Sequence, residues 1–257
     1  AYKRIWVIGA IHNDVLSLRK MHSALYDKVE SGDRIVYTGN MIGLFPHTRD
    51  TISEILGFRR WFLSLWPYMS PNDIVYLRGR QEEMLSKMLQ LHFAQEPLQI
   101  IDYLYKTGLS PVLEGYGFRR HEFEDAAAVG ASNLAEITTR LARVIRNYPG
   151  HDDLFKSLKH AAYSEDGVVL CVSSGLNGKI GLRDQGDNFW WGGENFARIT
   201  HAYGGYCRLV RGFDPQHGGY REGAFTVSLD QGESLKTVQA VCLDRFGEIV
   251  DRLSFSS

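Results

Sequence analysis

Residues 5–13, with the sequence IWVIGAIHN, join a short apolar run to a turn made of glycine and polar residues. The segments RIVYTGN at 34–40 and IVYLRGR at 74–80 repeat this arrangement. Each apolar run has the length of a buried strand and ends near a glycine, where the chain can turn sharply. Amphipathic stretches at 15–29 and 51–66 separate the three runs. The first third of the chain therefore predicts an α/β fold with a parallel sheet.

The composition is that of an ordinary globular protein. The 257 residues are 44% hydrophobic, which is enough to fill one large α/β domain or two small ones. Lys and Arg number 29 and Asp and Glu 30, so the net charge of -1 excludes a broad surface for nucleic acid. No apolar run approaches the ~18 residues of a membrane span, and the strand pattern that begins at Lys3 leaves no room for a signal peptide. We expect a cytoplasmic protein without membrane contact.

The rest of the chain divides into a helical part and a strand-rich part. From about 82 to 162, apolar residues recur at spacings of three and four, which predicts a helical cap. We expect the cap to be an insertion within a single domain, 1–257, because no linker or repeat separates it. After the cap, short apolar runs predict strands at 168–172, 206–210, 224–229, 238–243 and 249–255.

Three cysteines, Cys171, Cys207 and Cys242, each lie in an apolar run that is predicted to be a strand. They are odd in number and lack the spacing of metal ligands. We expect three buried free thiols in a reducing compartment.

Glycine and polar residues follow the predicted strands in five places. These loops cover residues 9–13, 39–43, 77–83, 172–176 and 210–215. In an α/β sheet the reactive groups lie in loops just beyond the carboxyl ends of the strands. A functional site is therefore expected where these five segments meet.

Taken in order and with their spacing, the five loops resemble the five motifs of the calcineurin-like metallophosphoesterases, in the bacterial branch akin to serine/threonine and dinucleotide polyphosphate phosphatases. The family's loops read Gly-Asp-x-His-Gly, Gly-Asp-x-x-Asp-Arg-Gly, Arg-Gly-Asn-His-Glu, His-Ala-Gly or His-Gly-Gly, and Gly-His-Thr or Gly-His-Asp. The resemblance covers most of the chain apart from the helical cap. It implies a sandwich of β-sheets flanked by helices, with two divalent metals that activate a hydroxide for attack on a phosphate ester.

The positions that would hold these metals are mostly changed. By comparison with the family pattern, the metal-binding aspartate of the first loop falls on Ala10, and His12 alone keeps its ligand type. The bridging aspartate of the second loop falls on Asn40, a neutral amide that offsets less cationic charge. In the third loop Arg80 replaces a ligand asparagine, and Gln81 replaces the histidine that protonates the leaving oxygen.

The fourth and fifth loops also depart from the family, because Ser173 and Phe213 stand in place of histidines. Five of the six metal positions thus differ from the pattern, which implies a pseudophosphatase with no metal cofactor. The alternative is an active enzyme with a relocated Mn or Fe site. Ligand candidates for such a site are Asp14, His47, Asp214 and His217. Against it, Asp14 has the position of a helix N-cap and Asp214 that of a turn residue.

A polar, cation-rich set of side chains remains in the same loops. The predicted ligand-binding residues are His12, Asn40, Arg78, Arg80 and Arg211. Their guanidinium groups suit a phosphate, a nucleotide or an acidic side chain that is held without cleavage. The alternative is that the arginines pair with Glu82, Glu83 or Asp33 and serve the structure alone.

These observations leave three functional hypotheses. The favoured one is a binding or regulatory module, which recognises a protein partner or a phosphate-containing small ligand through the vestigial pocket or the cap. The second is an active metal-dependent phosphatase or nucleotide hydrolase, and the third is a structural subunit of an assembly. Trp190 and Trp191 are expected to pack against a sheet edge.

Overall fold

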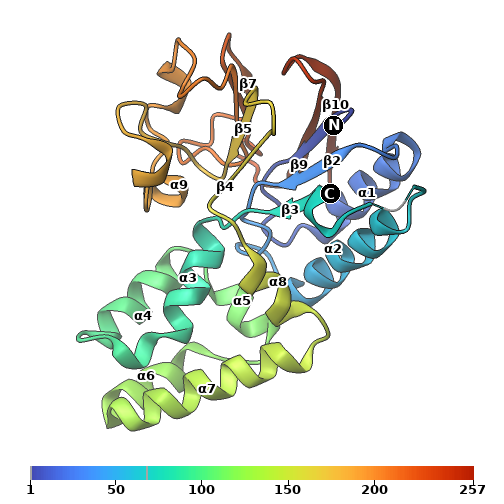
Figure 1. Cartoon of the computed structure of the whole chain (residues 1–257). Coiled ribbons are helices and arrows are strands. Elements are labelled where there is room, and N and C mark those ends of the chain that lie inside the picture. Colours follow the sequence, from blue (N-terminus) through green and yellow to red (C-terminus); the bar gives the residue numbers. More distant parts are fainter. Residues whose placement is uncertain (1, 68) are drawn as a thin grey trace.

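The computed structural model describes residues 2–67 and 69–257 of the chain. Two five-stranded sheets pack face to face, and helices α1 (Val15–Lys28) and α2 (Thr48–Leu63) lie along the first sheet (Figure 1). The remaining long helices form a group beyond one end of the sandwich (Figure 1). The predicted α/β sandwich with flanking helices and a helical insertion is confirmed.

The first sheet has the strand order β10 (Ile249–Ser256), β9 (Thr237–Leu243), β1 (Ile5–Ile8), β2 (Arg34–Tyr37) and β3 (Ile74–Tyr76). The last three are parallel, as predicted, and α1 and α2 connect them. The sheet is mixed because β9 runs antiparallel to β1, and β10 antiparallel to β9. Helix α2 begins and ends three residues earlier than the predicted range of 51–66.

The second sheet has the order β4 (Ala161–Tyr163), β5 (Val169–Val172), β6 (Arg208–Arg211), β8 (Thr226–Leu229) and β7 (Tyr220–Glu222). The three central strands are parallel, and β4 and β7 pair antiparallel at the two edges. The sequence analysis missed both edge strands. Each is only three residues long and is half-buried or exposed, so it lacks the apolar run that marks an inner strand.

The alternation of side chains along β1 shows how the two layers are filled. Ile5 and Val7 belong to a buried cluster between the sheets, together with Val210 and Val227 of the second sheet. Trp6 belongs to the core on the helical side. Because successive strand residues face opposite sides of a sheet, a strand covered on both faces needs an unbroken apolar run.

The helical segment runs from Arg80 to Ser157. It contains α3 (Arg80–Leu89), α4 (Pro97–Lys106), α5 (Ser110–Gly115), α6 (Arg120–Val129), α7 (Ala131–Asn147) and α8 (His151–Ser157). It ends before the expected residue 162, because Ala161 and Ala162 belong to β4. Its buried residues form one continuous apolar cluster with those residues of the first sheet that face the helices. None of the helices in the described ranges combines the length and apolar character that a membrane crossing requires.

The three thiols are free, but their environments differ. Cys171 in β5 and Cys242 in β9 are buried, and burial raises the pKa of each thiol to about 12. Cys207 is exposed and precedes β6. The prediction of a buried strand position is therefore wrong for Cys207, because β6 begins two residues later than the predicted run.

Two buried histidines connect elements of the helical layer. His22 belongs to α1. Its Nδ1 lies 2.7 Å from Oε1 of Glu54, and its Nε2 lies 2.8 Å from the Tyr37 hydroxyl oxygen. His151 of α8 lies 2.8 Å from the Tyr116 hydroxyl through Nδ1. Burial lowers the pKa of His22, against the effect of Glu54, and lowers the pKa of His151 to about 4. The native fold therefore favours the neutral form of both rings.

We expect the free energy of unfolding to decrease as the pH falls below the ordinary histidine pKa of about 6.5. In the unfolded chain His151 takes up a proton from that pH downward, whereas in the folded chain its pKa of about 4 keeps it neutral. Between these values the loss is about 1.4 kcal/mol per pH unit. Urea denaturation at several pH values should show a shallower decrease for His151→Gln than for the parent chain. Parallel pH profiles would contradict this account.

Candidate functional site

The loops after β1, β2 and β3 are held together by hydrogen bonds. The N–H groups of Ile11 and His12 donate to the carbonyl oxygen of Asn40 at 2.9 and 2.8 Å. The N–H of Gln81 donates to Oδ1 of Asn40 at 3.0 Å. His12, Asn40 and Gln81 are therefore neighbours at the carboxyl ends of three adjacent strands.

The loops after β5 and β6 join the same cluster. The N–H groups of Gly212 and Phe213 donate to the carbonyl oxygen of Ser173, both at 3.0 Å, and the N–H of Ala10 donates to Gly212. Gly212 approaches β2 so closely that a Cβ would lie 1.7 Å from Oγ1 of Thr38. Both sheets thus contribute to one cluster of residues. We call it the loop site, and it consists of Ala10, His12, Asn40, Arg80, Gln81, Ser173 and Phe213.

His12 lies at the centre of the loop site. Its ring is buried and meets the ring of Phe213 edge-on, with centroids 5.5 Å apart. Neither ring nitrogen has a side-chain hydrogen-bond partner among the described residues. Burial lowers the pKa of His12 to about 3, and the charges of His217 and Arg80 act in the same direction. His12 is therefore a neutral imidazole near neutral pH.

Arg80 is the unpaired cation of the loop site. Its guanidinium lies over the rings of Trp191 and Phe213, 5.2 and 5.3 Å from their centroids. Within the described ranges no carboxylate pairs with it, and its Nε is buried without an acceptor. Burial lowers the pKa of Arg80, because removing water from a guanidinium disfavours its charged form. The group can be compensated by an anion that enters from outside the chain.

Other buried polar atoms of the loop site also lack partners within the part of the chain that the structure describes. They are Nδ2 of Asn40, Oε1 of Gln81 and Oγ of Ser173. Buried polar groups in proteins are nearly always hydrogen-bonded, and the exceptions often mark a ligand or solvent site. Asn40 and Ser173 provide N–H and O–H donors, so the set accommodates an anion.

Arg78 and Arg211 behave differently from Arg80, although all three were predicted to bind a ligand. Nη1 of Arg78 lies 2.9 Å from Oε2 of Glu83. Nη2 of Arg211 lies 2.6 Å from Oδ2 of Asp214, with both side chains buried. Arg78 therefore has one of the partners that the alternative named, whereas Arg211 pairs with an acid that it did not name. Of the other proposed partners, Asp33 pairs with Arg4 and Glu82 binds backbone N–H groups.

Solved structures with the same architecture identify the fold. A protein proposed to be a diadenosine tetraphosphatase has a TM-score of 0.59 and 13% identity, with 99% of this chain and 95% of that chain covered. A protein serine/threonine phosphatase from Saccharomyces cerevisiae has a TM-score of 0.52 and 12% identity, with 99% and 80% covered. The chain has the calcineurin-like metallophosphoesterase fold.

A mutant of a cold-active protein tyrosine phosphatase matches this metallophosphoesterase fold as well. Its TM-score is 0.52 and its identity 10%, with 100% of this chain and 81% of that chain covered. Identities this low establish the fold and leave the chemistry to the residues of the site. No protein-family profile matches the sequence. No curated protein matches it either.

Glu82 holds the loops after β2 and β3 together through hydrogen bonds to their backbone, a role that the sequence analysis missed. Its carboxylate is buried and accepts from the N–H groups of Gly79, Asn40 and Met41 at 2.8–2.9 Å, and from Ile42 at 3.2 Å. Burial raises the pKa of Glu82, while these N–H groups act in the opposite direction. The signal was present, because Glu82 matches the glutamate that ends the third motif of the metallophosphoesterases.

The candidate ligands for a relocated metal do not converge on the loop site. Asp14 caps α1 by accepting from the N–H of Ser17, which confirms its helix-capping role. His47 is exposed and lies 3.6 Å from Asp50, and Asp214 is engaged by Arg211. His217 lies beyond the Phe213 ring, with centroids 5.5 Å apart. Across residues 2–67 and 69–257, no group of three His, Cys, Asp or Glu side chains is arranged to hold a metal ion.

The two tryptophans of α9 (Asn188–Trp191) have separate roles. Trp190 is buried in a cluster with Leu170 and Val172 of β5, so it packs against the second sheet as expected, but on an inner strand rather than at an edge. Trp191 is partly buried and carries the guanidinium of Arg80 over its ring. The aromatic segment thus anchors itself on the second sheet with one ring and faces the loop site with the other.

Proposed function

We propose that this protein is a pseudophosphatase, which uses the loop site to bind a phosphate-containing ligand without hydrolysing it. The observation that carries the proposal is the placement of Arg80, an unpaired cation among buried donors. A metal-dependent enzyme of this fold needs cation ligands in that position. The protein would then act as a binding or regulatory module that recognises a phosphate-containing ligand or a protein partner.

The absence of acids at the loop site supports a loss of two-metal catalysis. Two divalent cations need several oxygen and imidazole ligands and a bridging carboxylate. Ala10 offers no donor and Asn40 offers only an amide, whose oxygen already accepts from Gln81. The ring of Phe213 lies between His12 and Arg80, where it adds apolar surface in place of a ligand.

The character of the remaining groups supports anion binding. Guanidinium, amide and hydroxyl donors that lie in one cluster, as those of Arg80, Asn40 and Ser173 do, can together recognise a phosphate. Two buried acids of the adjoining loops, Glu82 and Asp214, are already satisfied by backbone N–H groups and by Arg211. Because neither acid faces Arg80 as a partner, the loop site favours ligands that carry negative charge.

The proposal predicts a purified protein without stoichiometric metal. We would express the chain with Mn²⁺ and Fe²⁺ supplied, measure metal content by mass spectrometry, and assay hydrolysis of p-nitrophenyl phosphate. We expect substoichiometric metal and no hydrolysis above that of the heat-denatured protein. About one or two metal equivalents, with turnover that is lost in His12→Ala, would overturn the proposal and establish an active enzyme.

A further inference from the structure

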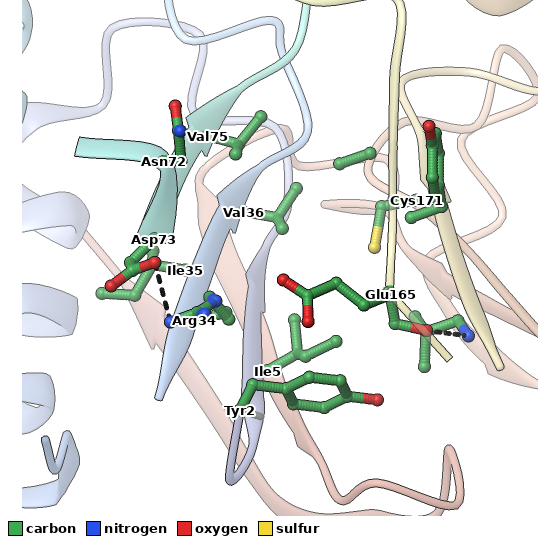
Figure 2. A pocket seen from close by; sticks show the side chains of 14 residues that line it. Tyr2, Ile5, Arg34, Ile35, Val36, Asn72, Asp73, Val75, Glu165 and Cys171 are labelled. Carbon is green, nitrogen blue, oxygen red and sulfur yellow. Dashed lines mark hydrogen bonds and ion pairs between the residues drawn. The ribbon is translucent and has the colours of Figure 1, made fainter. Parts of the chain in front are cut away.

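A cavity lies between the two sheets, at the amino ends of β1, β2 and β5 and thus opposite the loop site (Figure 2). Its volume is about 120 Å³. Strands β3 and β4, each at the edge of its sheet, contribute Val75, Ala162 and Tyr163 to its lining. The cavity is therefore a crevice at the open edge of the sandwich.

The inner wall of this cavity is apolar. Ile5, Val36 and Val75 line it from the first sheet, and Val169 and Cys171 line it from the second. Figure 2 shows Val36 and Cys171 on opposite sheets, both directed toward the space between them. Burial raises the pKa of the Cys171 thiol to about 12, so it stays protonated and serves as an apolar contact rather than a nucleophile.

The mouth of the cavity carries charged groups, most of which are already paired. Nη1 of Arg34 lies 2.7 Å from Oδ1 of Asp73, and the Tyr2 hydroxyl donates to Oδ2 of Asp166 at 2.8 Å. Among the described residues, Glu165 is the charged lining side chain without an ion pair or hydrogen bond. Glu165 is an exposed residue, and its carboxylate is directed toward the space between the sheets (Figure 2).

We propose that this cavity binds a small organic cation, a primary amine with a compact apolar body. The body would lie between Val36 and Val169, and the ammonium would meet the carboxylate of Glu165. A cavity of 120 Å³ is close to the roughly 150 Å³ that holds one benzene molecule. An unpaired carboxylate beside an apolar wall selects a cation over a neutral or anionic molecule of equal shape.

The experiment titrates benzylamine into the full chain, with ¹³C-labelled isoleucine and valine methyl groups observed by NMR. We expect saturable shifts confined to the methyls of Ile5, Ile35, Val36, Val75 and Val169, with a Kd on the order of 1 mM for so small a ligand. Benzyl alcohol, which has the same shape without the charge, should bind more weakly by up to about fivefold, because an ion pair with the exposed Glu165 stays partly hydrated.

Two variants separate the charge from the cavity. Glu165→Gln should weaken benzylamine binding to the level of benzyl alcohol, whereas Glu233→Gln, at an exposed carboxylate between β8 and β9, should leave it unchanged. Val75→Phe should block both ligands by filling the crevice. Equal binding of amine and alcohol, unchanged binding by Glu165→Gln, or shifts at other methyls would each overturn the proposal. The comparison of the two ligands needs no variant, so a folding defect cannot obscure the result.

Discussion

Replacing Glu82 with alanine is expected to lower the free energy of unfolding by about 4 kcal/mol or more. The carboxylate is buried and accepts from four backbone N–H groups, of Gly79, Asn40, Met41 and Ile42. Without it these donors lose their acceptor inside the protein, and each unsatisfied buried donor costs about 1–3 kcal/mol. Equilibrium denaturation in urea measures the difference directly.

The neighbouring Glu83 provides the matched control for this change. Its carboxylate pairs with Arg78 and Lys87, which are partly exposed, and ion pairs of this kind contribute about 1 kcal/mol or less. We therefore expect Glu83→Ala to have a much smaller effect than Glu82→Ala, while Glu82→Gln should fall between them because one amide oxygen remains. Equal losses for Glu82→Ala and Glu83→Ala would show that the backbone hydrogen bonds do not carry the stability of these loops.

Replacing Arg80 with methionine is expected to weaken the binding of inorganic phosphate at least about tenfold, measured by calorimetry. The guanidinium provides the only unpaired positive charge that the described residues place at the loop site. Methionine keeps the apolar contact with Trp191 and Phe213 but removes the charge. Because the cation–π contacts and the cost of burial oppose each other, unfolding free energy should change by only about 1 kcal/mol.

The other two arginines test whether charge alone explains the binding. Arg78→Met should retain phosphate binding, because Arg78 is committed to Glu83. Arg211→Met should destabilise the fold by about 3 kcal/mol or more, since it leaves Asp214 buried without its partner. Phosphate binding that survives Arg80→Met, or that is absent from the parent chain, would contradict the proposed anion site.

The central strands could be predicted from the sequence because they are buried on both faces. Val7 and Trp6 lie on opposite sides of β1 and each enters a core, so the run has no polar interruption. The edge strands β4 and β7 could not be predicted, because a short half-exposed strand depends on its neighbour for hydrogen bonds and carries no apolar pattern. Cys207 was misplaced for a related reason, since the start of β6 is set by pairing with β5.

For the loop site, the sequence identified which loops meet and which residues depart from the family pattern. It could not tell Arg80 from Arg78 and Arg211, which are equivalent guanidinium groups in the sequence. Only the contacts show that two of them are neutralised within the chain and one is not. Likewise, the sequence offered Glu82 as one of several possible partners for arginine. In the fold its carboxylate instead accepts hydrogen bonds from backbone N–H groups.

The sequence by itself determined the order of the elements, the apolar strands and the chemical types at the five loops. These properties follow from local patterns, since periodicity and glycine positions act within a few residues. The tertiary structure decided which charges are paired, that Phe213 contacts both His12 and Arg80, and that a crevice opens beside Glu165. Pairing and enclosure arise between segments far apart in the chain, and their energies depend on distance and burial, which a linear pattern does not encode.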